Sequence, residues 1–264
     1  MRQTIVFTGA TGGIGEALCK EFMKDSYTIL LVGRNLEKLI ALQHKLKDKQ
    51  DILLLPVDLR KKDAFLEIYS YVVEKKLEVD ILINAAGFGI YGEYLDQDIR
   101  SNQDLIMVNI MNLVCLCHVF GNEMKRRGRG YIINFSSISA FFPGKLMATY
   151  YASKAFISSF SIALAEELRH DHVDVLALCP GVVDTPFYKK SKSDRAHSYL
   201  LDRMPPISAR RFAKRAYCVI QRRKKMLHIS GVKNKIWIGI SRFLPVHILV
   251  KIIGFVQAKK IPPK

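Results

Sequence analysis

The sequence predicts an α/β fold in which one doubly wound parallel sheet is covered by helices on both faces. Short apolar segments rich in β-branched residues alternate with longer segments that have the apolar spacing of helices. This alternation is typical of parallel sheets with both faces covered. A chain of 264 residues can bury one large core. Because no repeat, low-complexity tract or Pro/Gly-rich linker divides it, we expect a single domain over residues 1–231 and a tail over 232–264.

The expected strands are short and apolar, and residues at helical spacing lie between them. The strands should cover Thr4–Thr8, Thr28–Val32, Ile52–Val57, Val79–Asn84, Tyr131–Ser136 and Val173–Leu178. The helices should cover residues 13–25, 35–48, 60–76, 98–126, 150–170 and 208–225. Between about residues 184 and 206, prolines and lysines interrupt the alternation. We interpret this segment as a substrate loop or lid over a site.

A glycine-rich turn with the spacing G-x-x-x-G-x-G separates the first strand from the first helix. Gly9 permits a tight turn, Gly13 lets backbone N–H groups approach a pyrophosphate, and Gly15 lets the helix pack on the strand. Such a turn alone can be structural, but its place between strand and helix favours a dinucleotide site. The expected cofactor contacts in this turn are Gly9, Thr11, Gly12, Gly13, Ile14 and Gly15.

Two further residues bear on the choice of cofactor. Arg34 follows the second strand, where an NAD site usually carries an acidic residue. Because a planar guanidinium suits a ribose 2′-phosphate, the sequence favours NADP(H), although a solvated arginine is also common after a strand. Asp58, at the end of the third strand, is placed to contact the adenine. A turn-capping aspartate explains it equally well.

The pair Tyr150 and Lys154 is the strongest catalytic signal. Residues four apart share one face of a helix, so both side chains can point into one site. A phenol has a reference pKa of about 10, and a neighbouring ammonium favours the phenolate and brings that value toward neutral pH. Tyr151 competes for this role, but only Tyr150 has the four-residue step to Lys154. Ser137 ends a strand at the edge where ligands bind in such sheets.

Residues 3–231 resemble the short-chain dehydrogenase/reductase family. The matching motifs follow the order of the family: Thr8–Gly15, Asn84–Gly87, Asn109, Ser137, Tyr150, Lys154 and Pro180–Thr185. Several spaced motifs in one order make the resemblance specific, whereas any one of them would not. It implies a Rossmann fold and an NADP(H)-dependent oxidoreductase that moves a hydride between nicotinamide and a carbonyl or alcohol carbon.

The resemblance also implies a role for each matched residue. Tyr150 would donate or accept the proton, Lys154 would hold the nicotinamide ribose, and Ser137 would bind the substrate oxygen. Asn109 would organise a proton path of water and lysine, with a helix cap or a solvated asparagine as the alternative. Ser136 competes with Ser137, although the spacing favours Ser137. Further cofactor contacts would come from Asn84, Ala85, Gly87, Pro180, Gly181, Val183 and Thr185.

Positive charge gathers in the last part of the chain. The net charge is +17, and residues 189–264 hold 20 of the 41 Lys and Arg residues but only two of the 24 acidic residues. The apolar stretches within this part are too often interrupted by polar residues to predict a spanning helix. From Pro245 onward the spacing predicts a helix that is apolar over most of its surface, with Ile, Leu, Val and Phe. One narrow stripe of the helix carries instead His247, Lys251, Gly254 and Ala258.

A basic and apolar tail fits an anionic membrane surface. Packing of the tail over the substrate cleft or at a subunit interface is the alternative. Because a strand starts almost at Met1, no signal peptide is expected. We therefore expect a cytoplasmic enzyme that is peripheral at the inner face of a membrane.

Composition and motifs also narrow the substrate and the partners. The substrate should be a small, lipophilic carbonyl or alcohol compound. Two alternatives are a 3-oxoacyl thioester reductase that docks an acidic carrier on its basic end, and an NADP(H)-binding redox sensor. We expect no metal and no nucleic acid, because neither ligand clusters nor interleaved aromatic and basic residues occur. The family resemblance implies a homodimer or homotetramer packed through the helices of residues 98–126 and 150–170.

Overall fold

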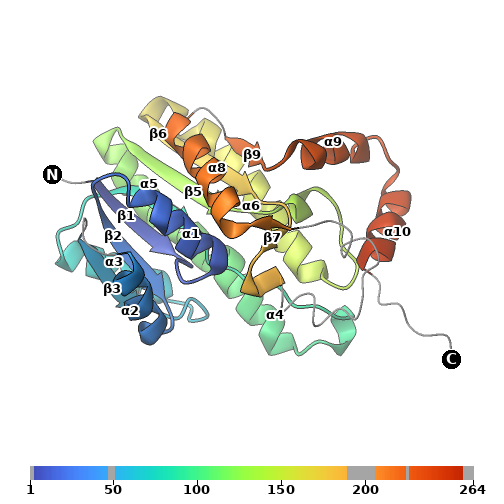
Figure 1. Ribbon diagram of the computed structural model, residues 1–264, viewed down its shortest axis with the longest axis horizontal. Helices are drawn as coiled ribbons and strands as arrows, with labels where there is room; N and C mark the ends of the chain where they lie inside the picture. Colours follow the sequence, from blue (N-terminus) through green and yellow to red (C-terminus); the bar gives the residue numbers. More distant parts are fainter. Residues whose placement is uncertain (1–2, 47–50, 189–205, 224–225, 258–264) are drawn as a thin grey trace.

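The computed structural model describes residues 3–46, 51–188, 206–223 and 226–257. At its centre lies a seven-stranded sheet in which all neighbouring strands are parallel (Figure 1). The strand order is β3-β2-β1-β4-β5-β6-β9. The strands are β1 (Gln3–Thr8), β2 (Tyr27–Gly33), β3 (Ile52–Pro56), β4 (Val79–Asn84), β5 (Gly130–Phe135), β6 (Val173–Cys179) and β9 (Leu227–Ile229). Because the order runs outward from β1 in both directions, the doubly wound Rossmann-like sheet predicted from the sequence is confirmed.

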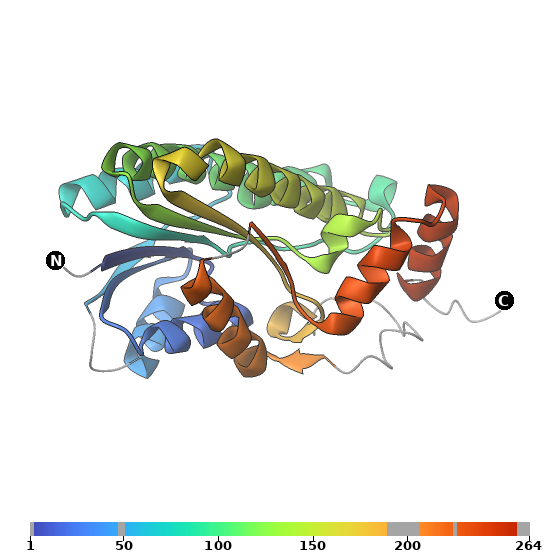
Figure 2. The same ribbon diagram turned by 90° about the horizontal axis from the view of Figure 1, so that it is seen from above.

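Helices cover both faces of the sheet (Figure 2). One face carries α1 (Gly13–Phe22), α2 (Leu36–Lys45) and α8 (Ala209–Arg222). The other face carries α3 (Ala64–Glu74), α5 (Asn112–Arg127) and α6 (Ala148–Glu167). Successive side chains of β1 enter the two cores in turn, Phe7 the first and Val6 the second. A strand buried on both faces reads as a continuous apolar run, which is why the strands could be found in the sequence.

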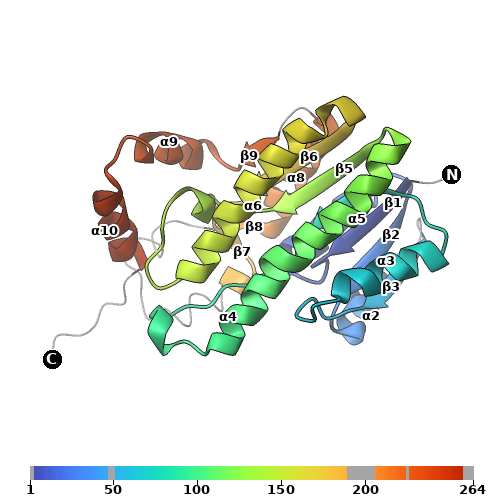
Figure 3. The same cartoon turned by 180° about the vertical axis from the view of Figure 1, so that it is seen from behind.

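The helix expected over residues 98–126 changes character in its middle. α4 (Ile99–Ile106) continues into α5 through a π-helical turn, η2 (Met107–Met111). Within the described ranges, this run alone is long and apolar enough to cross a membrane, but 44% of its most apolar window is buried inside the protein. It lies along the sheet in the covering layer (Figure 3). Packing on the sheet therefore accounts for part of its apolar character.

The C-terminal part contains elements that the sequence did not separate. β9 adds a seventh strand beside β6, and α9 (Val232–Ser241) and α10 (Val246–Gln257) form one end of the molecule (Figures 1 and 3). The expected substrate loop falls largely on residues 189–205, which lie outside the described residues. Its two flanks, β7 (Val183–Asp184) and β8 (Ile207–Ser208), pair in parallel.

One apolar side of α10 packs against the domain. Leu249 and Ile253 are buried in a third core cluster, together with residues of α9 and of the loop after β5. Gly254, which the sequence placed on the stripe opposite the apolar residues, is also buried. The expected stripe is therefore interrupted at Gly254, and Ala258, its last member, lies outside the described residues.

Candidate active site

The segments singled out in the sequence follow the carboxyl ends of neighbouring strands. The glycine turn follows β1, Asn84–Gly87 ends β4, Ser137 follows β5, and Pro180–Thr185 follows β6. β1 and β4 are the neighbours at which the strand order reverses. In open parallel sheets, ligands bind outside the carboxyl ends of the strands at this switch point. The fold therefore places these segments where a dinucleotide and its substrate would meet.

The glycine turn packs so tightly that a side chain would not fit at several positions. Gly9 has a φ of 73°, and a Cβ there would lie 2.4 Å from the nitrogen of Ala86. At Gly15 a Cβ would lie 2.3 Å from the Gly9 oxygen, where α1 begins against the turn. At Gly13 it would lie 2.8 Å from Cγ2 of Thr185. The turn therefore contacts the segments after β4 and β6, which assembles the cofactor side of the site.

The start of α1 fits a phosphate group. Asn35 caps α2 by accepting a hydrogen bond of 2.8 Å from a backbone N–H group, whereas Gly12, at the same place on α1, makes no side-chain capping bond. The first backbone N–H groups of α1 can therefore donate hydrogen bonds to a bound anion, whose negative charge the helix dipole also favours. Ile14 packs against the core, and Oγ1 of Thr11 lies 3.7 Å from where a Cβ of Gly33 would be.

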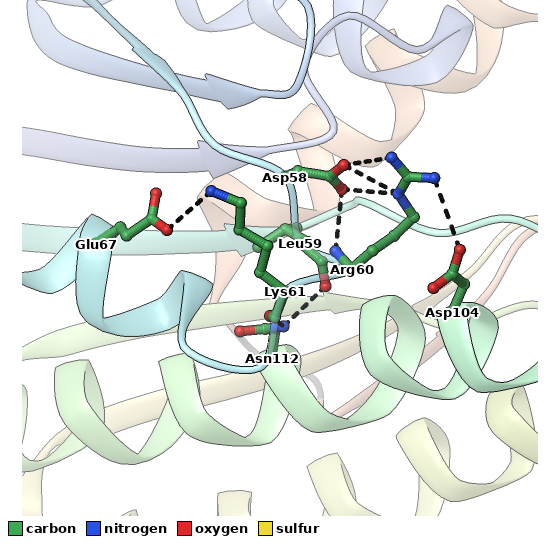
Figure 4. A network of polar contacts seen from close by, with 7 residues as sticks. All are labelled: Asp58, Leu59, Arg60, Lys61, Glu67, Asp104 and Asn112. Atoms are coloured by element: carbon green, nitrogen blue, oxygen red, sulfur yellow. Dashed lines mark hydrogen bonds and ion pairs between the residues drawn. The ribbon is translucent and has the colours of Figure 1, made fainter. Parts of the chain in front are cut away.

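Arg34 and Asp58 lie near one another beyond the ends of β2 and β3. Arg34 is exposed, and its charge acts on the Asp58 carboxylate. That carboxylate accepts hydrogen bonds from Nε and Nη2 of Arg60 at 2.9 and 2.6 Å and from its backbone nitrogen at 3.0 Å (Figure 4). The hydrogen bonds from Arg60 hold the pKa of Asp58 below its usual range. Nothing in the sequence signals Arg60, a second guanidinium at this place.

Asn112 holds the loop that carries Asp58. Its Nδ2 donates to the backbone oxygens of Leu59 and Lys61 at 2.8 and 3.0 Å, and its Oδ1 accepts from the backbone nitrogen of Phe65 at 3.0 Å. Figure 4 shows the amide of Asn112 directly below this loop. The sequence gives no sign of this role, because the three bonds join segments 47 to 53 residues apart.

The side chain of Asn84 lies in the core. Its Nδ2 donates to Oδ1 of Asn134 at 2.9 Å and to Sγ of Cys117 at 3.4 Å. Its buried Oδ1 has no hydrogen-bond partner within the described part of the chain. The side chain therefore ties β4 to β5 and α5. A cofactor can meet this turn through its backbone, around Ala85 and the exposed Gly87.

Tyr150 and Lys154 meet on α6. Nζ of Lys154 lies 5.7 Å from the centroid of the Tyr150 ring and donates a hydrogen bond of 2.8 Å to the Phe135 oxygen. Burial lowers the pKa of the Lys154 ammonium to about 8. The half-buried Tyr150 ring packs against Gly89, and its centroid lies 5.7 Å from that of Phe187. The site thus places a buried cation beside a phenol in largely apolar surroundings.

Tyr151, the alternative to Tyr150, packs elsewhere. Its ring covers Gly144, where a Cβ would lie 2.6 Å from ring carbons. The same ring contacts the cluster formed by Phe142, Ile238, Leu249 and Ile253. Tyr151 therefore anchors the C-terminal helices, although its ring centroid is only 6.1 Å from that of Tyr150.

Ser136 and Ser137 have different surroundings. Oγ of Ser136 donates to the backbone oxygen of Lys154 at 2.8 Å and lies 2.8 Å from Oγ of Ser158. Ser136 therefore joins β5 to α6. Ser137 caps the short helix η3 (Ile138–Phe141), where its Oγ accepts from the backbone nitrogen of Ser139 and donates to Oγ of Ser139, both at 3.1 Å. A small rotation of this hydroxyl can redirect its proton.

Asn109 lies inside the π-helical turn and is completely buried. Its Oδ1 accepts from the nitrogen of Phe88 at 3.1 Å, and its Nδ2 donates at 3.0 Å to the oxygen of Phe88 and to Oγ of Ser153. It is neither a helix cap nor solvated. A Cβ at Gly87 would lie 3.1 Å from Oδ1 of Asn109 and 3.4 Å from Nζ of Lys154. Both polar groups therefore border Gly87, and π turns are frequent at functional sites.

The segment after β6 closes this edge of the sheet. The Pro180 oxygen accepts a hydrogen bond of 3.0 Å from the nitrogen of Ile138, next to Ser137. Gly181 packs against Asn234 of α9, with no room for a Cβ, which would lie 2.4 Å from Nδ2. Two later members of the segment are buried: Val183 and Thr185. The serine turn, this segment and α9 are therefore in contact.

Potential metal ligands and buried thiols are further candidates for chemistry in the part of the chain that the structure describes. Over residues 3–46, 51–188, 206–223 and 226–257, no group of three His, Cys, Asp or Glu residues could hold a metal ion. Desolvation raises the pKa of the buried thiols of Cys117, to about 12, and Cys179. Both are therefore protonated and poorly nucleophilic at neutral pH.

Known proteins resemble this chain in sequence. The family model described as short chain dehydrogenase matches residues 3–196. An uncharacterized oxidoreductase of Staphylococcus epidermidis is 32% identical over 181 residues, which cover 69% of this chain and 78% of the relative. The human 17-beta-hydroxysteroid dehydrogenase type 3 is 34% identical over 195 residues, which cover 72% of this chain and 62% of the relative.

Solved structures resemble it in fold. A short-chain dehydrogenase from Sphingobium yanoikuyae in complex with NADPH superimposes with a TM-score of 0.78 at 23% identity, over 92% of this chain and 96% of that one. A 3-ketoacyl-(acyl-carrier-protein) reductase from Brucella melitensis complexed with NADH has a TM-score of 0.73 at 22% identity, over 85% and 94% of the two chains. With its family model, its sequence relatives and its fold in agreement, the chain belongs to the short chain dehydrogenase family of oxidoreductases.

Proposed function

We propose that this oxidoreductase uses NADP(H) to interconvert a carbonyl and an alcohol, with Tyr150 as general acid and base. The proposal depends chiefly on the buried ammonium of Lys154, 5.7 Å from the centroid of the Tyr150 ring. A positive charge beside a phenol stabilises its phenolate form, which eases proton transfer in both directions. The nearby Ser137 and Asn109 complete the set of polar groups that the reaction needs.

The protein supplies the proton and the polar contacts of the reaction. When bound, a nicotinamide cofactor would supply the hydride chemistry. During reduction, Oη of Tyr150 donates its proton to the substrate oxygen, while Oγ of Ser137 donates a hydrogen bond to the same oxygen. Both bonds stabilise the negative charge that develops there. Oxidation uses the same two groups in reverse, so the pair serves either direction.

Lys154 and Asn109 return Tyr150 to its starting state. We propose that Lys154 holds the ribose of the cofactor and keeps a positive charge beside the phenolate. Oδ1 of Asn109 lies beside Gly87, where Nζ of Lys154 is also within reach. A water molecule bound by these two groups would carry a proton between Tyr150 and solvent.

Each part of the cofactor has a matching group in the protein. The uncapped start of α1 would bind the pyrophosphate, Arg34 the 2′-phosphate, and Asp58 the adenine. Arg60 pairs with Asp58 and would contribute to the same end of the cofactor. The preference for NADP(H) over NAD(H) is supported by Arg34, because the segment that ends β2 carries this arginine and no acidic residue.

We further propose a lipophilic substrate for a cytoplasmic enzyme that touches an anionic membrane surface with residues 232–264. Gly89, Met147 and Phe187 surround the Tyr150 ring with apolar atoms. The name of the human relative points to steroids as one class of such substrates. We also propose a homodimer or homotetramer packed through the helices of residues 98–126 and 150–170, which form α4, α5 and α6. The 41% exposure of Phe156 on α6 supports an interface on this side.

The test is turnover of NADPH with a panel of ketones, aldehydes and 3-oxoacyl thioesters. Tyr150→Phe keeps the ring but removes the proton donor, and kcat should fall by about 100- to 10,000-fold. Tyr151→Phe is the matched control, because it changes the neighbouring ring in the same way, and it should retain most activity. NADPH binding, followed by fluorescence, should survive in both variants. Full activity of Tyr150→Phe would overturn the acid–base assignment.

A further inference from the structure

α9 carries a stripe of exposed apolar side chains along one side. Val232, Ile236 and Ile240 recur at steps of four residues, which place them on one face of α9. Phe243 follows three residues later in the turn after the helix, where its backbone nitrogen donates a hydrogen bond of 3.0 Å to the Ile240 oxygen. The exposed fractions of these four residues are 71%, 58%, 51% and 88%. Single exposed apolar residues are ordinary on a protein surface, but a contiguous row of four large ones marks an interaction site. We call these four residues the α9 stripe.

The opposite side of α9 fixes the helix on the enzyme. Ile238 is 3% exposed, and it packs with Trp237, Phe142 and α10 in the third core cluster. Ser241 is also buried. The apolar side chains of α9 therefore lie on two opposite faces. Packing within the described chain buries one face and leaves the other face, the α9 stripe, exposed. The α9 stripe is held outward by a folded support and is not a frayed end.

Positive charge borders the α9 stripe on both sides. Lys233 follows Val232 by one position and Lys235 precedes Ile236 by one position, so they fall on opposite flanks of the stripe. Arg242 precedes Phe243 on the same flank as Lys235. No acidic residue occurs anywhere after Asp202 in the sequence. An apolar stripe between basic flanks is the pattern of helices that lie in the interface of an anionic bilayer.

We propose that the α9 stripe docks on the surface of an anionic lipid bilayer, with Phe243 and Ile240 inserted among the acyl chains and the lysines at the headgroups. This names the face through which the proposed membrane contact of residues 232–264 is made, and it rests on that contact. It assigns the contact to α9, whereas α10 turns Leu249 and Ile253 into the core and exposes Val246 and Phe255.

Docking through this face places the active site close to the lipid. α9 contacts the serine turn through the third core cluster, and its Asn234 packs against Gly181. In Figure 1, α9 and α10 form the end of the molecule beyond β9, well away from α2 and α3. A substrate dissolved in the bilayer would therefore reach the enzyme at the end that carries its catalytic groups.

The test is flotation of the full-length protein with vesicles of phosphatidylcholine, with and without phosphatidylserine. The wild type should bind the anionic vesicles and release them at high salt, because the charge interactions are screened. The double variant Ile240→Ser with Phe243→Ser should weaken binding at least about tenfold, and Lys233→Glu with Lys235→Glu should do the same. Val73→Ser is the matched control, since Val73 is 57% exposed on α3.

Turnover with a water-soluble ketone separates this proposal from the catalytic one. All of these variants change residues outside the proposed catalytic groups, so they should turn over the water-soluble ketone as the wild type does, whether or not they bind vesicles. Wild-type protein that ignores anionic vesicles, or a stripe variant that binds as well as Val73→Ser, would overturn the proposal. A fall in molar mass by light scattering in the stripe variant alone would assign the stripe to a second copy of the chain and would also overturn it.

Discussion

Lys154 places a positive charge in a buried position. The desolvation of this ammonium should lower the free energy of unfolding of the protein. Burial lowers the pKa of its ammonium to about 8, whereas an unfolded lysine titrates near about 10.4. Well below pH 8 both states are protonated and the cost is fully present. Between these two values the unfolded chain binds more protons than the folded one, so the contribution of Lys154 to stability rises with pH.

Comparison of the wild type with Lys154→Met isolates this effect. The difference in free energy of unfolding should move in favour of the wild type by up to about 3 kcal/mol between pH 8 and pH 10.4. Below pH 7 the difference should be constant. Urea denaturation without cofactor, at half-unit steps of pH, measures it. A difference that is flat across the whole range would mean that Lys154 is not desolvated as its burial indicates.

Arg34 should decide between the two nicotinamide cofactors. Arg34→Asp replaces a guanidinium that suits a 2′-phosphate with an acid that suits a 2′-hydroxyl, so the ratio of kcat/KM for NADPH to that for NADH should fall by about tenfold or more. Lys76→Asp is the control, because it reverses an exposed charge three residues before β4, at the amino end of that strand and so opposite the candidate site. If the ratio is unchanged in Arg34→Asp, Arg60 becomes the better candidate.

The turn before α5 shows how one helix organises two parts of the site. Asn109 and Asn112 are three residues apart, and each side chain makes three hydrogen bonds. Those of Asn109 go to Phe88 and to Ser153 of α6, whereas those of Asn112 go to the backbone of residues 59–65. Asn109 lies on the side of the proposed catalytic groups, and Asn112 holds the loop that carries Asp58. The π-helical turn between α4 and α5 adjusts the direction of these side chains within an otherwise continuous helix.

Asn112→Leu should destabilise the fold and weaken cofactor binding together. The change leaves three backbone groups without their partner, at a cost of about 2 to 5 kcal/mol in the free energy of unfolding. The KM for the cofactor should rise more than kcat falls, because Asn112 positions the Asp58 loop and touches no reacting atom. Asn122→Ala, on the exposed side of α5, should change stability by less than about 0.5 kcal/mol.

The sequence predicted the elements better than their details, for physical reasons. Strands β1, β2, β4, β5 and β6 are apolar on both faces, so each appears as a distinct run. The three-residue β9 has no such run and depends on β6 for its pairing. The π turn is equally hidden, since no residue type marks it. The tyrosine and lysine at a four-residue step could be found, because helix geometry alone brings them together.

Other site features depend on contacts between distant segments, and the sequence could not show them. Nothing local distinguishes Ser136, which joins β5 to α6, from Ser137, which caps η3. Asn84 appeared as a cofactor contact, yet its side chain is engaged in the core. Arg60 was hidden because an arginine two residues after an aspartate is common. Each case required knowledge of which strands and helices are neighbours.

For the whole molecule, the outer faces of α5 and α6 are where we expect two copies of the chain to meet in the proposed oligomer. Phe156 stacks on Phe160 with ring centroids 5.9 Å apart and is 41% exposed. If the proposed oligomer uses this face, Phe156→Glu should place an unpaired charge in its interface and yield a monomer. Light scattering measures the molar mass. Leu66→Glu, on α3 and 47% exposed, should leave it unchanged, and an unaltered mass in both variants would place the interface elsewhere.

The strand order also bears on how the protein is made. β1 is synthesised first and lies inside the sheet, and each later strand joins one that already exists: β2 joins β1, β3 joins β2, and β4 joins the free side of β1. β5, β6 and β9 then follow in turn on that side. Within this seven-stranded sheet, as far as the described residues show it, each strand after β1 finds its first partner already synthesised, so the sheet can assemble while the chain is being translated.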